Sequence, residues 1–284
     1  MLSFEFTGER LFDASARPGA VRLDVEQRPG VEPVEIWRDG IRHWILFADR
    51  SEYRIRDGEI RCHLRRPGQE AIAEVEFLDS VLPFYLQLQG RAVLHASAVC
   101  VEGKVFVFVA DSGSGKSSLA VALLRRGAAL VSDDVAALSR EEGRFLVSPA
   151  YPQLRLWRPA AEALTGVAHH RAIHPEWQKR RVPLDGWARF AGGPCELGAV
   201  YILVDGADDD PVSVSPLGGH AGVMALMGQS IALPVLSIQE RAERLAFFSD
   251  LVRNTPVRRL RFPKDFARMD EVVEAVMEGT AKGV

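Results

Sequence analysis

The chain has 284 residues, of which 47% are hydrophobic and 26% are charged, as in ordinary globular proteins. Its formal net charge of −3 provides no basic surface, so we expect neither nucleic acid nor a membrane as a partner. Three cysteines, odd in number and far apart, predict neither a disulfide framework nor a cysteine metal site. No targeting pattern and no apolar run of about 18 residues is present in the sequence, which predicts a cytoplasmic protein.

Residues 1–76 predict a small antiparallel β region. Short alternating runs, such as those at 44–47 and 59–64, are separated by Asp-Gly and Pro-Gly turn signals. Over residues 77–88 the apolar positions follow helical spacing and Gly90 is a suitable stop, so residues 77–90 are expected to form a helix that links two domains. The second domain is expected to span residues 91–284.

A glycine-rich turn lies near the start of this second domain. Residues 93–101 and 104–110 predict two strands, the turn follows, and residues 119–126 predict a helix. Gly113 and Gly115 let successive backbone N–H groups point into one concavity, where the start of the helix adds its positive dipole end. A strand, a turn and a helix in this order predict a phosphate cradle, or Walker A loop, for a nucleoside triphosphate.

The side chains of this turn have distinct expected roles. Lys116 would reach the β and γ phosphates, and the Ser117 hydroxyl would hold a Mg²⁺ that bridges them. The other predicted nucleotide contacts are Asp111, Ser112, Gly113, Ser114, Gly115 and Ser118. The usual pattern begins with a glycine where this chain has Ala110. The alternative is a plain strand-to-helix turn with a solvated Lys116, which the order of the elements disfavours.

An acidic pair follows at a distance typical of P-loop proteins. Residues 128–132 predict a short buried strand that ends at Asp133 and Asp134. Beside a phosphate loop, one carboxylate can hold Mg²⁺ and the other can take a proton from an attacking hydroxyl. Neighbouring side chains of a strand point to opposite faces, so the two acids can act together only if the strand ends there. Read alone, such a pair is typical of a turn or a helix cap.

Two further positions are candidates for the site. His95 is expected within the strand at 93–99, as a core residue or, if this strand lies next to the aspartate strand, as a group that orients Asp133. Arg155 lies in an otherwise apolar run, where it serves the transferred phosphoryl group or is a paired structural arginine.

Residues 169–181 have no clean periodicity and predict a loop. Lys179, Arg180 and Arg181 in this loop are either a solvated charge cluster or part of a lid that contacts phosphate or an acidic substrate. The histidines of the same stretch lack metal-ligand spacing and are expected at the surface; they are His169, His170 and His174. Further along, residues 199–204 and 256–262 predict strands, and residues 239–254 and 265–278 predict helices.

Four elements in order resemble the kinase domain of the HPr kinase/phosphorylase family: His95-Ala96, the turn at 110–117, Arg126-Gly127, and the run 131–134. The match is gapless over about residues 90–140. The resemblance implies an α/β fold with a P-loop kinase core of the HPr kinase and phosphoenolpyruvate carboxykinase type. It also implies ATP and Mg²⁺ as cofactors, and phosphorylation of a serine hydroxyl on a protein.

The same resemblance implies the roles of single residues. Asp133 is the general base with His95 as its neighbour, Lys116 is the phosphate ligand, and Ser117 and Asp134 are the Mg²⁺ ligands. The family's downstream Glu-Ile-Arg-Gly-Leu-Gly signature is replaced by Gln-Leu-Arg-Leu-Trp at 153–157, which keeps the arginine and turns a metal-binding acid into an amide. The N-terminal β region does not look like that family's regulatory domain.

The Leu-Arg-Leu-Trp and Leu-His-Ala-Ser segments resemble the subgroup that includes lasso-peptide precursor kinases. This implies a serine at the end of a precursor peptide as the acceptor. Two alternatives stay open: a bifunctional HPr kinase/phosphorylase of carbon regulation, and a regulatory protein that binds ATP without transferring phosphate. For the kinase we expect a peptide or protein acceptor and a homo-oligomer.

Overall fold

The computed structural model describes residues 2–26, 34–56, 58–165, 172 and 178–281. The chain is a mixed α/β protein with several sheets, and its contacts divide it into two compact units. One unit comprises Met1–Tyr85 with Ala232–Ser237, and the other comprises Leu86–Ile231 with Ile238–Val284. The predicted boundaries at residues 76 and 90 do not include the short segment 232–237, whose place in the first unit depends on contacts distant in sequence.

The first unit is built on a six-stranded sheet in the order β1-β6-β5-β4-β3-β2. Its neighbouring strands are antiparallel except for β1, which runs parallel to β6. The strands are β1 (Ser3–Thr7), β2 (Val21–Glu26), β3 (Val34–Asp39), β4 (Arg42–Phe47), β5 (Ser51–Arg56) and β6 (Glu59–Leu64). These residues form strands, as predicted, but β1 departs from the predicted antiparallel pairing.

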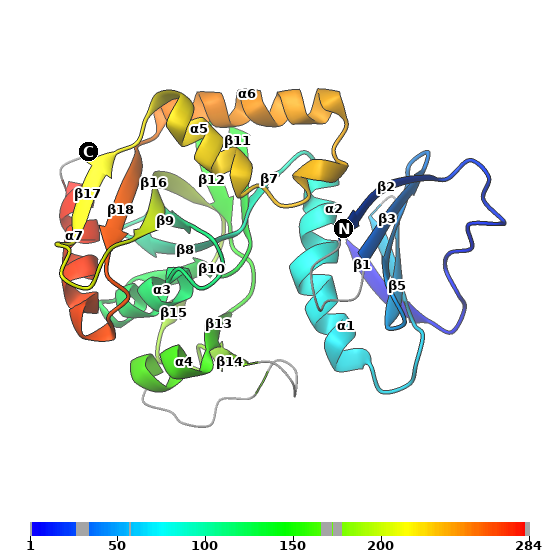
Figure 1. Cartoon of the computed structure of the whole chain (residues 1–284), viewed down its shortest axis with the longest axis horizontal. Helices are drawn as coiled ribbons and strands as arrows, with labels where there is room; N and C mark the ends of the chain where they lie inside the picture. The colour runs from blue at the N-terminus through cyan, green and yellow to red at the C-terminus, as the bar shows by residue number, and fades with distance from the viewer. Residues whose placement is uncertain (1, 27–33, 57, 166–171, 173–177, 282–284) are drawn as a thin grey trace. The chain divides into compact units, whose positions relative to one another are not determined.

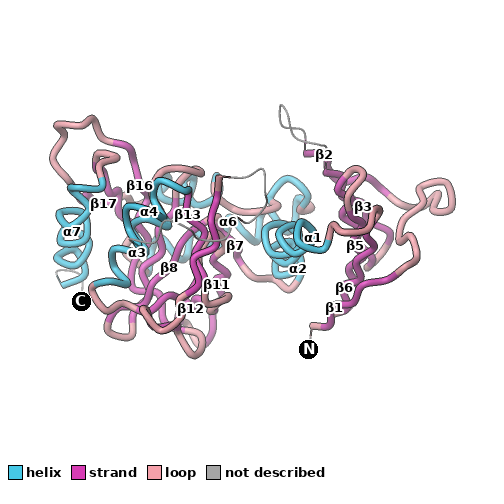
Figure 2. Tube along the Cα trace, turned by 90° about the horizontal axis from the view of Figure 1, so that it is seen from below, coloured by secondary structure: helices cyan, strands magenta, loops and turns pink. Residues whose placement is uncertain are grey.

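Helical structure follows this sheet and begins earlier than the sequence predicts. It comprises α1 (Glu70–Glu76), a π-helical turn (Phe77–Val81) and α2 (Leu82–Leu88), so the predicted start at residue 77 is wrong. The reason is that Glu76, an acid, occupies a buried position where the helical pattern calls for an apolar residue. Its carboxylate accepts hydrogen bonds from Ser51 and Arg50. The Tyr53 hydroxyl donates to the Ala73 carbonyl (2.7 Å), which holds α1 beside the sheet (Figure 2).

The second unit has helices on both faces of a ten-stranded sheet (Figure 1). Alternate residues of β9 (Lys104–Val109) pack on opposite faces of this sheet. One face carries Val105, Val107 and Val109, which pack with α5 and α6. The other carries Phe106 and Phe108, which pack with α3, α4 and α7. The helices are α3 (Lys116–Arg125), α4 (Arg158–Thr165), α5 (Gly219–Gly228), α6 (Ile238–Asn254) and α7 (Met269–Ala281), with 3-10 turns at Leu233–Val235 in the first unit and at Phe266–Arg268 in the second. No helix among the described residues is long and apolar enough to cross a bilayer.

The strands of the second unit fix where the candidate site lies. They are β7 (Ala92–Leu94), β8 (Ala96–Val101), β9 (Lys104–Val109), β10 (Ala129–Ser132), β11 (Ala136–Glu141), β12 (Arg144–Ser148), β15 (Arg189–Phe190), β16 (Cys195–Asp205), β17 (Ser213–Pro216) and β18 (Val257–Phe262), with β13 (Gln153–Trp157) and β14 (Lys179–Pro183) as a separate pair. The strands β9, β16 and β18 are mutually parallel. β10 runs in the same direction, because β9 and β10 are both antiparallel to β8. The carboxyl ends of all four strands therefore lie along one edge, where ligands of α/β sheets bind.

Candidate active site

The glycine-rich loop connects β9 to α3, as the sequence predicts. Gly113 and Gly115 have φ angles of 84° and 88°, in the left-handed region that favours glycine. Ala110, which stands where the usual motif has its first glycine, does not have a positive φ. An L-residue therefore fits there without backbone strain, and the departure from the motif leaves the turn intact.

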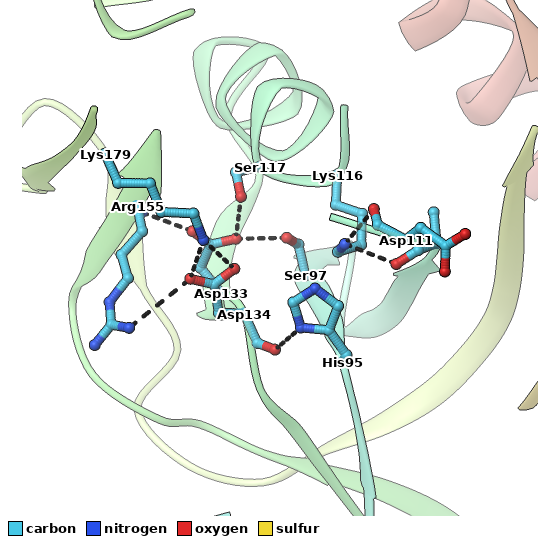
Figure 3. A network of polar contacts seen from close by, with 10 residues as sticks. His95, Ser97, Asp111, Lys116, Ser117, Asp133, Asp134, Arg155 and Lys179 are labelled. Carbon is cyan, nitrogen blue, oxygen red and sulfur yellow. Dashed lines mark hydrogen bonds and ion pairs between the residues drawn. The ribbon is translucent and has the colours of Figure 1, made fainter. Parts of the chain in front are cut away.

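Lys116 is the first residue of α3 and lies almost buried against the loop. Its Nζ donates to the carbonyl oxygens of Ala110 (2.8 Å) and Asp111 (3.0 Å). Figure 3 shows Lys116 beside Asp111. Burial lowers the pKa of this ammonium, an effect that the nearby carboxylates oppose. The loop thus holds a cation at its mouth through two neutral carbonyls, which an anionic phosphate can replace as a stronger partner.

Asp133 is enclosed by hydrogen-bond donors. Only 1% of it is exposed, and its carboxylate accepts from Ser97 Oγ (2.5 Å), Ser117 Oγ (2.8 Å) and the backbone N–H of Arg155 (2.7 Å). Burial, and then the charge of Asp134, raise the pKa of Asp133 to about 6, although the three donors oppose the shift. This carboxylate is tied to the loop serine rather than directed to solvent.

Asp134 has a different environment because the strand ends before it. β10 stops at Ser132, and Asp134 takes a φ of 64°, a left-handed conformation that Asp tolerates better than most residues. Its carboxylate lies 3.3 Å from Lys179 Nζ and 3.9 Å from Arg155 Nη1, and it lines the cavity described below. The end of the strand is the condition under which two adjacent acids can share one site.

His95 lies in the break between β7 and β8, so its predicted place within a continuous strand is wrong. Its backbone N–H donates to the Gln229 carbonyl (2.9 Å), outside the pairing of the two strands. Its Nδ1–H donates to the Asp134 backbone carbonyl (3.0 Å; Figure 3). Burial and then the charge of Lys116 lower the pKa of His95, which favours the neutral ring; since Nδ1 donates, Nε2 of that form is an acceptor. His95 therefore supports the backbone of the acidic pair.

Ser97 is the site residue that sequence reasoning misses. It is fully buried on β8 and its hydroxyl touches Asp133, the contact that the sequence analysis assigned to His95. The available signal is its position two residues after His95, because alternate residues of the strand predicted at 93–99 share one face. A lone serine among small residues gives no other indication of a role.

The basic residues predicted as a loop are in a strand. Lys179 and Arg180 belong to β14, which pairs antiparallel with β13 so that Lys179 lies opposite Trp157 and Arg181 opposite Arg155. Three consecutive cations leave no alternation of polar and apolar residues at the start of this strand, and its partner β13 is distant in sequence. The sequence therefore does not predict the strand. Lys179 reaches the Asp134 carboxylate, and Arg180 donates to the Lys179 backbone carbonyl. The predicted loop histidines, His169, His170 and His174, lie outside the described residues.

A cavity of about 200 Å³, partly open to solvent, joins these groups. Lining residues that the sequence analysis names are His95, Ser112, Gly113, Gly115, Lys116, Ser117, Ser118, Asp134, Arg155 and Lys179. Asp133 is absent from the lining, in agreement with its burial.

The residues present fit a Mg²⁺ ion that is bound together with a nucleotide. Ser117 Oγ and the Asp133 carboxylate are in direct contact, and Asp134 supplies a second carboxylate at the cavity wall. Among the described residues, no three His, Cys, Asp or Glu side chains form a metal cluster. Mg²⁺ in phosphate sites needs only one or two carboxylates, because phosphate and water complete its shell.

No family model matches the chain, and no curated protein does. Among solved structures it is similar to the Hpr(Ser) kinase/phosphatase from Coxiella burnetii, with 16% sequence identity over 67% of this chain and 91% of that chain. The TM-score of this similarity is 0.37. At that value the similarity does not establish a shared fold or activity, so the family that the motifs resemble stays a prediction, and the function proposed below rests on this chain's own residues.

Proposed function

We propose that the protein is an ATP-dependent kinase that transfers the γ-phosphoryl group to a serine hydroxyl of a peptide or protein. The observation that supports this most is one cavity whose wall combines a glycine-rich loop, the cations Lys116, Arg155 and Lys179, and the acid Asp134. Phosphoryl transfer needs mainly positioning and charge stabilisation, and these are the groups that supply them.

The three cations would contact different parts of the triphosphate. Lys116, at the mouth of the loop, would exchange its two carbonyl partners for phosphate oxygens. Arg155 and Lys179 approach the cavity from the β13–β14 pair and would stabilise the charge on the transferred group. When bound, Mg²⁺ would be held by Ser117 with the Asp133 carboxylate beside it, and it would neutralise part of the phosphate charge.

For the acidic pair, we propose to exchange the roles that the resemblance implies. A general base must come within hydrogen-bond reach of the hydroxyl. Asp133 is enclosed by three donors and does not line the cavity, whereas Asp134 does. Asp134 is therefore the proposed proton acceptor. Asp133 accepts a hydrogen bond from Ser117 and is the proposed carboxylate beside the metal ion. Ser117 remains the proposed metal ligand.

The proposed acceptor follows from the resemblance of the sequence segments. A serine of a peptide or protein follows from the resemblance of the loop and acidic pair, and a lasso-peptide precursor follows from the resemblance of the two shorter segments. The other two functions, a kinase/phosphorylase and an ATP-binding regulator, use the same loop. The reaction products distinguish the three functions.

The test is incubation of the full chain with γ-labelled ATP, Mg²⁺ and a set of serine peptides that includes precursor-like C-terminal serines. The kinase yields labelled phosphoserine, and Lys116→Ala abolishes the label. Pyrophosphate formed from phosphate and phosphopeptide would identify the phosphorylase. Tight ATP binding with no labelled acceptor would identify the regulator and overturn the proposal.

A further inference from the structure

The cavity extends to the side of the glycine-rich loop that lies away from the acids. In the sheet, β9 carries the loop, β10 with its two acids lies on one side, and β16 and β18 lie on the other. Since these strands run in the same direction, the residues that follow β18 lie at the same edge as the loop. A ligand bound across the loop would therefore have one end at Asp134 and the other near Phe262.

This second end is an apolar slot. One wall consists of Phe262, Phe266 and Met269. Trp157 and the start of α4 also line the cavity. The Phe262 ring lies 3.4 Å from where a Cβ on Gly115 would be, so this wall directly adjoins the loop. Phe266 is 44% exposed, which leaves much of its side chain free to cover a ligand.

The polar side chains of the same wall already have partners. Lys264 Nζ lies 2.7 Å from Asp205, and Asp265 Oδ1 accepts from the Ala267 backbone N–H at 2.9 Å. The slot therefore offers aromatic and aliphatic surface, which suits a flat, uncharged group better than phosphate. The acid Asp134 lies on the β10 side of the loop, whereas the wall with Phe262 follows β18 on the other side.

We infer that this slot binds the nucleobase of the nucleoside triphosphate, with Phe266 as the residue that stacks on it. The inference rests on the proposed function, since it places the base of the same nucleotide whose phosphates lie on the loop. Recognition by stacking depends on ring area rather than on edge hydrogen bonds. The slot therefore prefers purine over pyrimidine triphosphates and distinguishes ATP from GTP by only a few-fold.

The experiment measures Mg²⁺-dependent binding of ATP and of inorganic tripolyphosphate to the full chain by calorimetry. Tripolyphosphate carries the phosphates without a base, so it reports on the loop alone. Phe266→Ala should weaken ATP binding about 10-fold, the scale of one base–aromatic stack, and leave tripolyphosphate binding unchanged. Phe266→Trp should keep ATP affinity. Phe6→Ala is the matched control, because Phe6 is 49% exposed on β1 and does not line the cavity.

The outcomes separate the slot from the loop. Selective loss of ATP affinity in Phe266→Ala, with ATP and GTP bound more tightly than CTP and UTP, supports the inference. Unchanged ATP affinity in that variant overturns it, and so does an equal loss of ATP and tripolyphosphate. If wild-type protein binds neither compound, or Lys116→Ala binds both normally, the proposed function itself fails.

Discussion

Replacement of Ser97 by alanine tests whether Asp133 is a buried, ionisable carboxylate of the site. Ser97 is fully buried, and its hydroxyl donates to Asp133 Oδ1 at 2.5 Å. A hydrogen bond to a charged group contributes about 1.5–3 kcal/mol to stability, and one between neutral groups about 1 kcal/mol. We therefore expect Ser97→Ala to lower the free energy of unfolding by about 1.5–3 kcal/mol when Asp133 is ionised, and by about 1 kcal/mol when it is protonated.

The pH window follows from the pKa of Asp133, which is about 6 in the folded chain against 3.8 for an ordinary aspartate side chain. Because the folded pKa is the higher one, the stabilising contribution of protonated Asp133 is present below pH 3.8 and is lost as the pH rises through about 6. The Ser97 hydroxyl lowers this pKa, so its removal raises the pKa further. The stability gap between wild type and Ser97→Ala should therefore widen as the pH rises from about 4.5 to 8.

Urea unfolding of both proteins at several pH values, followed by tryptophan fluorescence, measures this gap. Ser132→Ala is the matched control, because Ser132 is also fully buried but donates to the Val135 carbonyl rather than to a carboxylate. The loss of unfolding free energy caused by Ser132→Ala should not change with pH. A Ser97→Ala cost that is equal at pH 4.5 and pH 8 would refute the reasoning, since Asp133 would then not titrate in contact with this hydroxyl.

Three further substitutions test the proposed roles. Asp134→Asn keeps a residue type that tolerates the φ of 64°, so it should fold and bind Mg²⁺-ATP but transfer phosphate about 10²–10⁴-fold more slowly; turnover within 10-fold of wild type in a quenched-flow assay would contradict the proton-acceptor role. Lys116→Met should weaken Mg²⁺-ATP binding at least about 10-fold, because it removes the cation at the loop; calorimetry that shows wild-type affinity would be incompatible with a phosphate ligand. Lys179→Gln breaks an ion pair whose side chains are only 24% and 11% exposed, so stability should fall by more than about 1 kcal/mol, the value typical of exposed pairs. The kcat for transfer should fall about 10-fold or more, and an equal kcat would make Lys179 a structural residue only.

The parts of the site that sequence predicts are those with a local signal. The glycine-rich turn, the strand before it and the helix after it lie within a short stretch, and the apolar strand before Asp133 is visible in the same way. Their spacing along the chain also places the acids at the loop, because parallel strands bring their carboxyl ends to one edge.

The remaining parts depend on pairing and burial, which have no local signal. Ser97 contributes because β8 lies between β9 and β10, and nothing beside Ser97 in the sequence reports that order. Lys179 is brought to Asp134 by a strand whose consecutive cations resemble a solvated loop. The difference between the two acids arises from where β10 ends, and element ends are poorly determined by periodicity.

The most direct test of the account is transfer of label from γ-labelled ATP to a serine peptide by wild type and Asp134→Asn under saturating Mg²⁺-ATP. The account predicts labelled phosphoserine from wild type, and little or none from the variant although it still binds nucleotide. Wild-type protein that binds Mg²⁺-ATP yet labels no serine peptide, or a variant that labels as fast as wild type, would contradict it.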